Sequence, residues 1–101
     1  MALRINEQAN KHFHIRIEGH FVFDGYREFL DAVNELAAHA LEATVDLTRV
    51  EYMDTAGLGL LLTMRNRLST GRINLKVCEG SQVCHTLKVA SLSRLFAIEA
   101  I

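Results

Sequence analysis

The sequence predicts a single α/β domain over residues 1–101, in which helices pack on a mixed, mostly parallel sheet of four to five strands. Segments with apolar residues at every second position alternate with segments of helical spacing, in the order ββαβαβα with room for a final strand. Strands that alternate with helices need crossover connections, which favour parallel pairing. Half of the residues are hydrophobic, and no proline or low-complexity tract marks a linker between domains.

The first two strands are expected to pair as an antiparallel hairpin. Leu3 and Ile5 alternate with polar neighbours, and the turn is expected at Asn10-Lys11. From Phe13 to Phe23, apolar residues then occupy every second position except at Gly19, where we expect a β-bulge or a bend. This hairpin is the reason for predicting a mixed sheet.

The spacing of apolar residues changes at Asp24, which indicates a helix. Apolar side chains recur every three or four residues from Tyr26 to Leu41, with acidic side chains on the opposite side. Asp24 is the expected N-cap. The next segment, Ala43 to Leu47, predicts a short buried strand that continues irregularly to Met53.

A leucine-rich helix is expected from about Thr55 to Ser69, with Gly71 at its end. Its first turns are apolar nearly all round, which predicts that they are covered on more than one side. The remaining expected elements are an alternating strand at Ile73 to Val77, a helix from the N-cap Ser81 to about Val89, and a short strand within Leu95 to Ile101.

The charge distribution favours a protein that docks on other proteins. The net charge is −1, but residues 1–54 contain ten acidic and five basic side chains, and residues 55–101 contain two and six. This asymmetry suits protein docking and fits nucleic acid poorly. No apolar run approaches the roughly 20 residues of a membrane span, and the N-terminus lacks the pattern of a signal peptide. Two cysteines do not make a disulfide framework, so we expect a cytoplasmic protein without membrane insertion.

The most informative segment runs from Asp46 to Gly59. A strand leaves the core there, and Thr55 is the expected N-cap of the next helix. Gly57 and Gly59 each cost about 1 kcal/mol inside a helix, so either the helix packs closely on the sheet or another molecule approaches it closely. A helix N-terminus would tolerate a phosphate on Thr55, although Asp54 opposes it. The simpler alternative is a capping threonine.

Within this segment, Asp46-Leu47-Thr48, Val50 and Met53-Asp54-Thr55-Ala56-Gly57-Leu58-Gly59 resemble the signature of the STAS domain, best known from bacterial anti-sigma factor antagonists. The likeness extends over nearly the whole chain. It implies a regulator without catalysis or cofactor. In that family, a serine kinase of the histidine-kinase-like ATPase fold phosphorylates the hydroxyl residue after the motif aspartate, and this kinase is in some cases the anti-sigma factor itself. A PP2C-type phosphatase removes the phosphate, and the unphosphorylated form binds and sequesters its partner.

The resemblance implies a role for each matching position. Thr55 is the expected phosphate acceptor, and Asp54, Ala56, Gly57 and Leu58 are the expected partner-binding surface around it. Small residues permit close approach, and added charge would repel a surface matched to the neutral form.

Three departures from the family pattern accompany these expectations. The acceptor is threonine rather than the commoner serine. Gly19 and Val22 are expected at the partner-binding surface, but the family usually has an acidic residue where Val22 stands. Family members also often add a C-terminal helix, whereas this sequence ends at Ile101.

Other functions share parts of the pattern. The STAS subunit of a lipid-transporting ABC system has a similar Asp-Thr-small-Gly-Leu motif and works as a stable subunit on its ATPase. Asp54-Thr55 is also similar to the Asp-Thr-Gly of aspartic proteases, but Ala56 intervenes and a paired carboxylate would require a dimer. We expect no metal site, because the histidine and cysteine side chains that could bind zinc lack the spacing of zinc ligands. These candidates are His12, His14, His20, Cys78, Cys84 and His85.

Overall fold

Five strands form one sheet in the order β1-β2-β3-β4-β5 in the computed structural model, which describes residues 1–68 and 72–101. The elements are β1 (Ala2–Ala9), β2 (His12–Phe21), the short 3-10 helix η1 (Phe23–Gly25), α1 (Tyr26–Ala37), β3 (Glu42–Met53), α2 (Thr55–Arg67), β4 (Arg72–Val77), α3 (Gln82–Val89), the 3-10 helix η2 (Leu92–Arg94) and β5 (Ala97–Ala100). The predicted fold class and element order are confirmed, including the final strand. Ser69 and Gly71, where the second helix was expected to end, lie outside the described residues.

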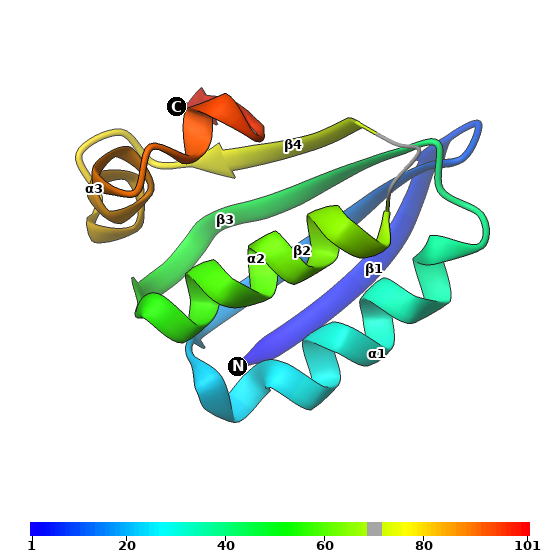
Figure 1. Cartoon of the computed structure of the whole chain (residues 1–101), viewed down its shortest axis with the longest axis horizontal. Helices are drawn as coiled ribbons and strands as arrows, with labels where there is room; N and C mark the ends of the chain where they lie inside the picture. The colour runs from blue at the N-terminus through cyan, green and yellow to red at the C-terminus, as the bar shows by residue number, and fades with distance from the viewer. Residues whose placement is uncertain (69–71) are drawn as a thin grey trace.

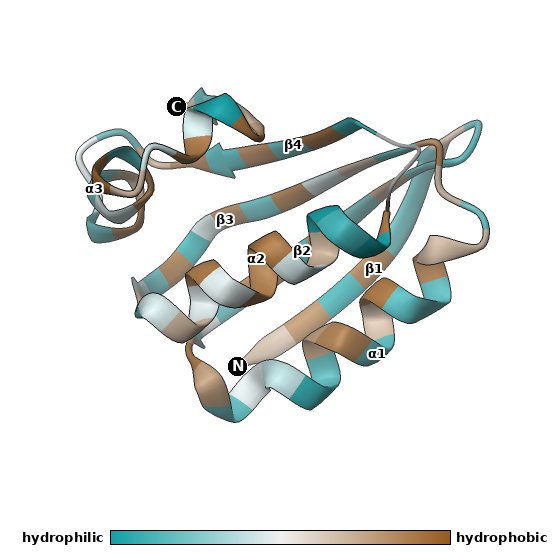
Figure 2. Cartoon of the chain, viewed as in Figure 1, coloured by the Kyte–Doolittle hydropathy of each residue, from teal (hydrophilic) through white to brown (hydrophobic). Residues whose placement is uncertain are grey.

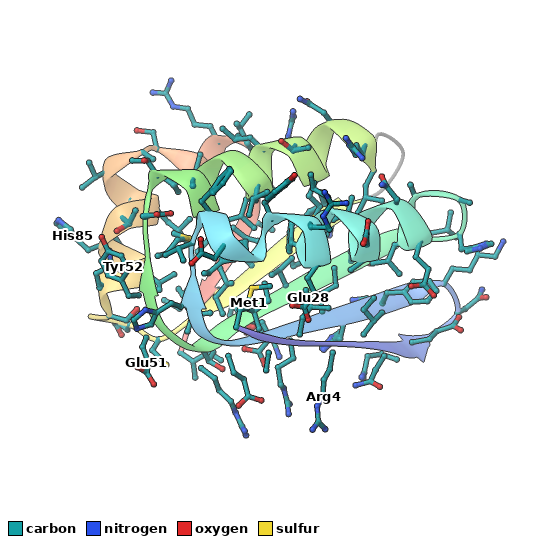
Figure 3. All side chains as sticks on the ribbon, turned by 90° about the horizontal axis from the view of Figure 1, so that it is seen from below. Met1, Arg4, Glu28, Glu51, Tyr52 and His85 are labelled. Atoms are coloured by element: carbon teal, nitrogen blue, oxygen red, sulfur yellow. The ribbon has the colours of Figure 1, made fainter. Side chains whose placement is uncertain are left out.

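The sheet is mixed, as the sequence predicts. β1 pairs antiparallel with β2, and the other neighbouring strands pair in parallel. α1 and α2 lie side by side over one face, and α3 lies near the ends of β3 and β4 (Figure 1). In the view turned by 90°, Arg4 of β1 points away from these helices, so the opposite face carries polar side chains (Figure 3).

One apolar core fills the space between the sheet and the helices. Hydrophobic and hydrophilic bands alternate along the strands in Figure 2, and successive strand residues point to opposite faces, so the apolar side chains gather on one face of the sheet. Ile15, Ile17 and Leu75 are fully buried there, and Phe29 of α1 and Leu61 of α2 are fully buried against them. This core holds α2 against the sheet.

β3 is one long strand with two bulges, rather than the short strand with an irregular continuation that was expected. Its pairing with β2 shifts between Arg16 and Glu18 and again between Gly19 and His20. Gly19 has a φ of +89° at the second shift, which confirms the predicted bulge. The bulges let β3 reach Met53 while remaining bonded to β2.

The expected start of the first helix is wrong. Asp24 lies inside η1, and Gly25 precedes α1 without a side-chain cap. The Gly25 N–H donates to the Val22 carbonyl at 3.0 Å, so a tight turn inserts itself before the helix. The helix also ends at Ala37 rather than Leu41.

The first turns of the second helix were expected to be covered on more than one side, and α2 packs both on the sheet and against α1. α2 buries Gly57, Leu60, Leu61 and Met64, whereas Leu62 is 36% exposed. One side of α2 therefore keeps an apolar surface open to solvent.

Candidate functional site

Thr55 is the first residue of α2, directly after the end of β3. The N-cap is Asp54, whose Oδ1 accepts a hydrogen bond from the Gly57 N–H at 3.0 Å. The prediction that Thr55 caps the helix is therefore wrong, because the residue before it already satisfies the free N–H. Within residues 1–68 and 72–101 the Thr55 side chain forms no hydrogen bond, and the residue is exposed. Its hydroxyl group is free for chemistry with another molecule.

Gly57 is glycine because of packing inside the molecule. A Cβ at this position would lie 2.5 Å from the Phe21 carbonyl oxygen and 2.6 Å from Cγ of Met53. Gly59 differs, since a Cβ there would meet no atom of the described residues within 4 Å. Of the two explanations considered for these glycines, close packing on the sheet accounts for Gly57, and nothing in the fold requires Gly59.

Thr55 stands at the edge of a hollow between α2 and α3. The hollow has a volume of about 250 Å³ and is lined by Thr55, Leu58, His85, Thr86, Val89 and Ala90. Its walls are mainly apolar, and Val89 is 72% exposed. We call these six residues the α2–α3 hollow. The hollow is therefore an apolar surface beside the exposed Thr55 side chain.

The structure brings together some of the expected partner-binding residues and separates others. Asp54, Ala56 and Leu58 are half-buried around Thr55, and Gly57 lies buried beneath them. Gly19 and Val22 are half-buried on β2 and just after it, and neither lines the α2–α3 hollow.

Val22 lines a second hollow of about 220 Å³, which lies beside the end of β2 and the start of α1. Its further lining residues are Met1, His20, Asp24, Gly25 and Glu28. Met1 and Glu28 lie close together in Figure 3, whereas Tyr52 and His85 lie toward one end of the molecule.

Exposed aromatic side chains lie near the ends of β2 and β3, and sequence analysis did not predict their exposure. Phe23 is 63% exposed and stacks on Tyr26, with ring centroids 5.1 Å apart. Tyr52 is 46% exposed and meets His20 edge-on at 6.0 Å. Because β2 and β3 are parallel, both pairs lie at the end of the sheet where Thr55 begins α2.

Gln82 also escaped sequence analysis. Its carboxamide forms hydrogen bonds with both the N–H and the carbonyl oxygen of Met53, at 2.9 and 2.8 Å. Its partner is main chain 29 positions earlier, and no residue pattern reports such a contact.

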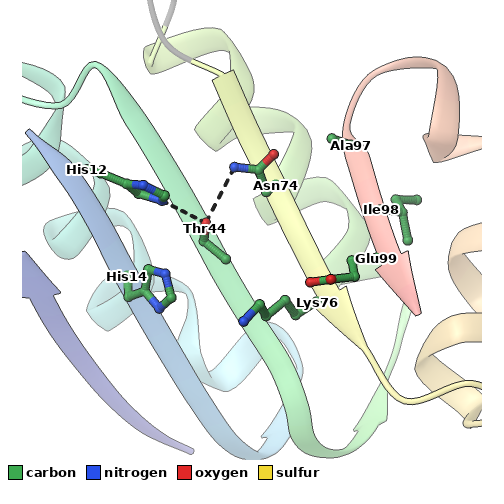
Figure 4. Close-up of a pocket in the computed structure, with 8 residues that line it drawn as sticks. All are labelled: His12, His14, Thr44, Asn74, Lys76, Ala97, Ile98 and Glu99. Atoms are coloured by element: carbon green, nitrogen blue, oxygen red, sulfur yellow. Dashed lines mark hydrogen bonds between the residues drawn. The ribbon is translucent and has the colours of Figure 1, made fainter. Parts of the chain in front are cut away.

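The uncovered face of the sheet holds a third hollow, of about 390 Å³ (Figure 4). Thr44 is buried at its base, where its hydroxyl lies 2.9 Å from Nε2 of His12 and 3.4 Å from Nδ2 of Asn74. Partial burial and the neighbouring His12 and Lys76 lower the pKa of His14. In the part of the chain that the structure describes, no group of three or more His, Cys, Asp or Glu side chains is placed to hold a metal ion.

A family model described as "Mlab, STAS domain" matches residues 5–97. The chain belongs to the STAS domain family. This STAS domain is 31% identical over 86 residues to a STAS-domain-containing protein of Pseudomonas aeruginosa (strain UCBPP-PA14), covering 83% of the chain and 84% of that protein.

Solved structures of anti-sigma factor antagonists share the fold of this STAS domain. An antagonist from Mycobacterium paratuberculosis superposes with a TM-score of 0.85 at 16% identity, covering 99% of this chain and 86% of that one. The antagonist SpoIIAA in its unphosphorylated form gives a TM-score of 0.77 at 17% identity, covering 99% and 89%. The phosphorylated form of SpoIIAA from Bacillus gives 0.75 at 16% identity, covering 98% and 92%.

No helix within residues 1–68 and 72–101 has the length and apolar character needed to cross a membrane.

Proposed function

We propose that this STAS domain is a phosphorylation-switched binding protein of the anti-sigma factor antagonist type. In its unphosphorylated form it binds a serine kinase or anti-sigma factor of the histidine-kinase-like ATPase fold, and phosphorylation of Thr55 releases that partner. A PP2C-type phosphatase restores the binding form. The observation that carries the proposal is the exposed, unbonded hydroxyl of Thr55 at the start of α2, beside the apolar α2–α3 hollow.

Local electrostatics support Thr55 as the acceptor. The first turn of α2 is the positive end of the helix dipole, which stabilises a phosphate. The Asp54 carboxylate opposes it but is engaged by the Gly57 N–H. A phosphate would add about −1.5 to −2 charges at the rim of an apolar hollow. A partner surface matched to the neutral form would then face an unpaired charge and release.

Capture from a native lysate tests the switch, with wild-type, Thr55→Ala and Thr55→Glu proteins as baits. We expect wild type and Thr55→Ala to retain a soluble kinase-fold protein, and Thr55→Glu to lose it. Thr63→Glu is the matched control, because Thr63 lies on the same helix and its hydroxyl donates to the Gly59 carbonyl. Phosphate found on the Thr55→Ala protein after incubation with the kinase would contradict the assignment.

The α2–α3 hollow gives a second test that leaves Thr55 unchanged. Val89→Asp places a charge on an exposed wall of the hollow and should reduce partner binding at least about tenfold. Leu41→Asp is the control, because Leu41 is 58% exposed and does not line the hollow. Equal binding by both variants, measured by titration calorimetry, would exclude the hollow from the interface.

The Asp54-Thr55-Ala56-Gly57-Leu58 motif favours a second candidate, the STAS subunit of a lipid-transporting ABC system. Such a subunit would hold a transport ATPase without reversible phosphorylation. Capture of a transport ATPase by wild type, Thr55→Ala and Thr55→Glu alike would establish this candidate and reject the switch.

A further inference from the structure

β3 continues beyond its neighbour β4. In the described part of the chain, β4 pairs with β3 from Glu42 to Asp46, whereas β2 follows β3 as far as Met53. Within residues 1–68 and 72–101 the Met53 backbone therefore has no strand partner on the side that faces α3, and its N–H and carbonyl groups need other partners.

The carboxamide of Gln82 supplies both partners. The Met53 N–H donates to Oε1 at 2.9 Å, and Nε2 donates to the Met53 carbonyl oxygen at 2.8 Å. A primary amide presents a donor and an acceptor side by side, as the backbone of a neighbouring strand does. Gln82 thus replaces, with one side chain, the strand that β4 no longer provides.

The same carboxamide is held from within α3. Nε2 also donates to Oγ1 of Thr86 at 3.0 Å, and that hydroxyl donates to the Gln82 carbonyl at 2.9 Å. The oxygen of the carboxamide faces an N–H and its nitrogen faces two oxygens, so the network permits one orientation of the amide. Gln82 is the first residue of α3, so the hydrogen bonds of its carboxamide fix the beginning of that helix.

Both ends of this connection reach the proposed docking site. Met53 immediately precedes Asp54 and Thr55, and the Asp54 side chain holds the Gly57 N–H. Thr86 lines the α2–α3 hollow. The hydrogen bonds therefore run from a wall of the hollow, through Gln82, to the backbone that carries the phosphate acceptor.

We propose that Gln82 is the positioning residue of this site, an inference that rests on the proposed role of Thr55. It keeps the start of α2 and the outer face of α3 in one relative arrangement, so that a partner meets Thr55 and Val89 as a preformed surface. A preformed surface binds more tightly because less freedom is lost on association. Gln82 contributes to affinity through Met53 and need not touch the partner.

Amide hydrogen exchange measured by NMR on the isolated chain tests this role. Gln82→Ala should raise the exchange rates of the Gly57 and Leu58 N–H groups about fivefold while Val33 in α1 is unchanged. These two amides bond to Asp54, not to Gln82, so their response reports position rather than a lost contact. Gln8→Ala is the control, because Gln8 is an exposed glutamine in β1. A change confined to Met53 would overturn the proposal.

Gln82→Glu keeps the side-chain length and tests the amide itself. At pH 7 the introduced carboxylate cannot donate to the Met53 carbonyl, so protection at Leu58 should fall relative to wild type. At pH 3.5 the protonated carboxyl group donates again, and the ratio of variant to wild-type protection should recover. The role of the Gln82 amide would be overturned if Leu58 in the Gln82→Glu variant were as protected as in wild type at pH 7, or if its protection did not recover at pH 3.5. This test holds even if Gln82→Ala destabilises the whole chain.

None of these exchange measurements contains a partner, so their failure is distinct from failure of the proposed function. Where capture identifies a partner, Gln82→Ala should weaken its binding about tenfold and Gln8→Ala should not. Unchanged affinity of the Gln82→Ala protein would overturn the positioning role while leaving Thr55 as the acceptor.

Discussion

Gly57 and Gly59 stand two residues apart in α2 and have opposite environments. Gly57→Ala would place a Cβ 2.5 Å from the Phe21 carbonyl oxygen, so we expect a loss of about 2 kcal/mol in unfolding free energy. Gly59→Ala adds a methyl group in open space and should gain about 0.5–1 kcal/mol, because alanine favours helix. Urea denaturation followed by circular dichroism measures both, and similar changes in the two variants would contradict this account.

Asp54 caps α2, and we propose Thr55 as the phosphate acceptor. Substituting each residue by alanine separates these two roles. Asp54→Ala removes the N-cap bond to Gly57 and should cost about 1 kcal/mol of unfolding free energy. Thr55→Ala should stay within about 0.5 kcal/mol of wild type, because an exposed, unbonded side chain is removed. Thermal unfolding of the two variants checks this, and the reverse order would show that Thr55 caps α2.

These residues also show where sequence reasoning reaches its limit. The motif correctly locates the start of α2, but aspartate and threonine both cap helices, so composition cannot choose between them. Gln82 was missed because its partners are backbone atoms brought close only by the fold. Gly57 was correctly singled out because a glycine inside a helix carries a cost that needs a compensating contact.

At the level of elements, the first bulge of β3 explains part of the motif. Oδ1 of Asp46 accepts hydrogen bonds from the Thr48 N–H at 2.9 Å and from its hydroxyl at 2.6 Å, where the pairing with β2 shifts. Burial raises the pKa of Asp46, but these bonds, with Arg16 and Lys76 nearby, outweigh it and the net pKa is lowered. The Asp-Leu-Thr sequence thus fixes the local shape of β3, the strand that precedes Thr55.

This arrangement predicts a pH-dependent effect of removing the Asp46 carboxylate. Asp46→Ala should lower the free energy of unfolding by about 2 kcal/mol at pH 7. Because the folded pKa is lowered, the contribution of Asp46 is complete above the ordinary aspartate pKa of about 3.9 and is lost as pH falls through the folded value. Urea denaturation at pH 7 and pH 3 measures the difference in unfolding free energy between wild type and Asp46→Ala, which should be smaller at pH 3. Asp31→Ala, on the exposed side of α1, is the control, and a constant gap would contradict the role of the charge.

Helices α1 and α2 show what hydrophobic spacing can and cannot predict. α1 has one apolar side, and its position was predicted except for its ends, where η1 takes Asp24 out of the helix. α2 is apolar nearly all round in its first turns, and the sequence predicted cover on more than one side without indicating which side stays exposed. Leu62 is exposed and Leu58 is half-buried, and Leu58 lines the α2–α3 hollow that we propose for docking.

For the whole molecule, the alternation of strands and helices was sufficient to predict the architecture. The parallel order of β2 to β5 follows from the crossovers, and the antiparallel edge follows from the short turn between β1 and β2. The hollows could not be predicted in the same way, because each is formed by residues from separate elements.

A single core predicts cooperative unfolding of the whole chain. The buried cluster extends from Ile15 to Phe96 and includes Leu36 of α1 and Leu87 of α3. Leu36→Ala and Leu87→Ala should each cost about 3 kcal/mol and shift far-UV circular dichroism and methyl NMR signals to the same new midpoint. Separate midpoints for the two probes would show that the α3 end unfolds by itself.

The stacked and edge-on aromatic pairs have a spectroscopic consequence. The chain has no tryptophan and two tyrosines, Tyr26 and Tyr52, and both belong to the pairs at the sheet end where α2 begins. Its tyrosine emission, excited at about 280 nm where phenylalanine absorbs negligibly, therefore originates at that end of the sheet. The docking of a tryptophan-free partner at this end, or the addition of a phosphate there, can be followed through the native fluorescence of the unlabelled protein. Changes at the β1–β2 turn would not alter this fluorescence.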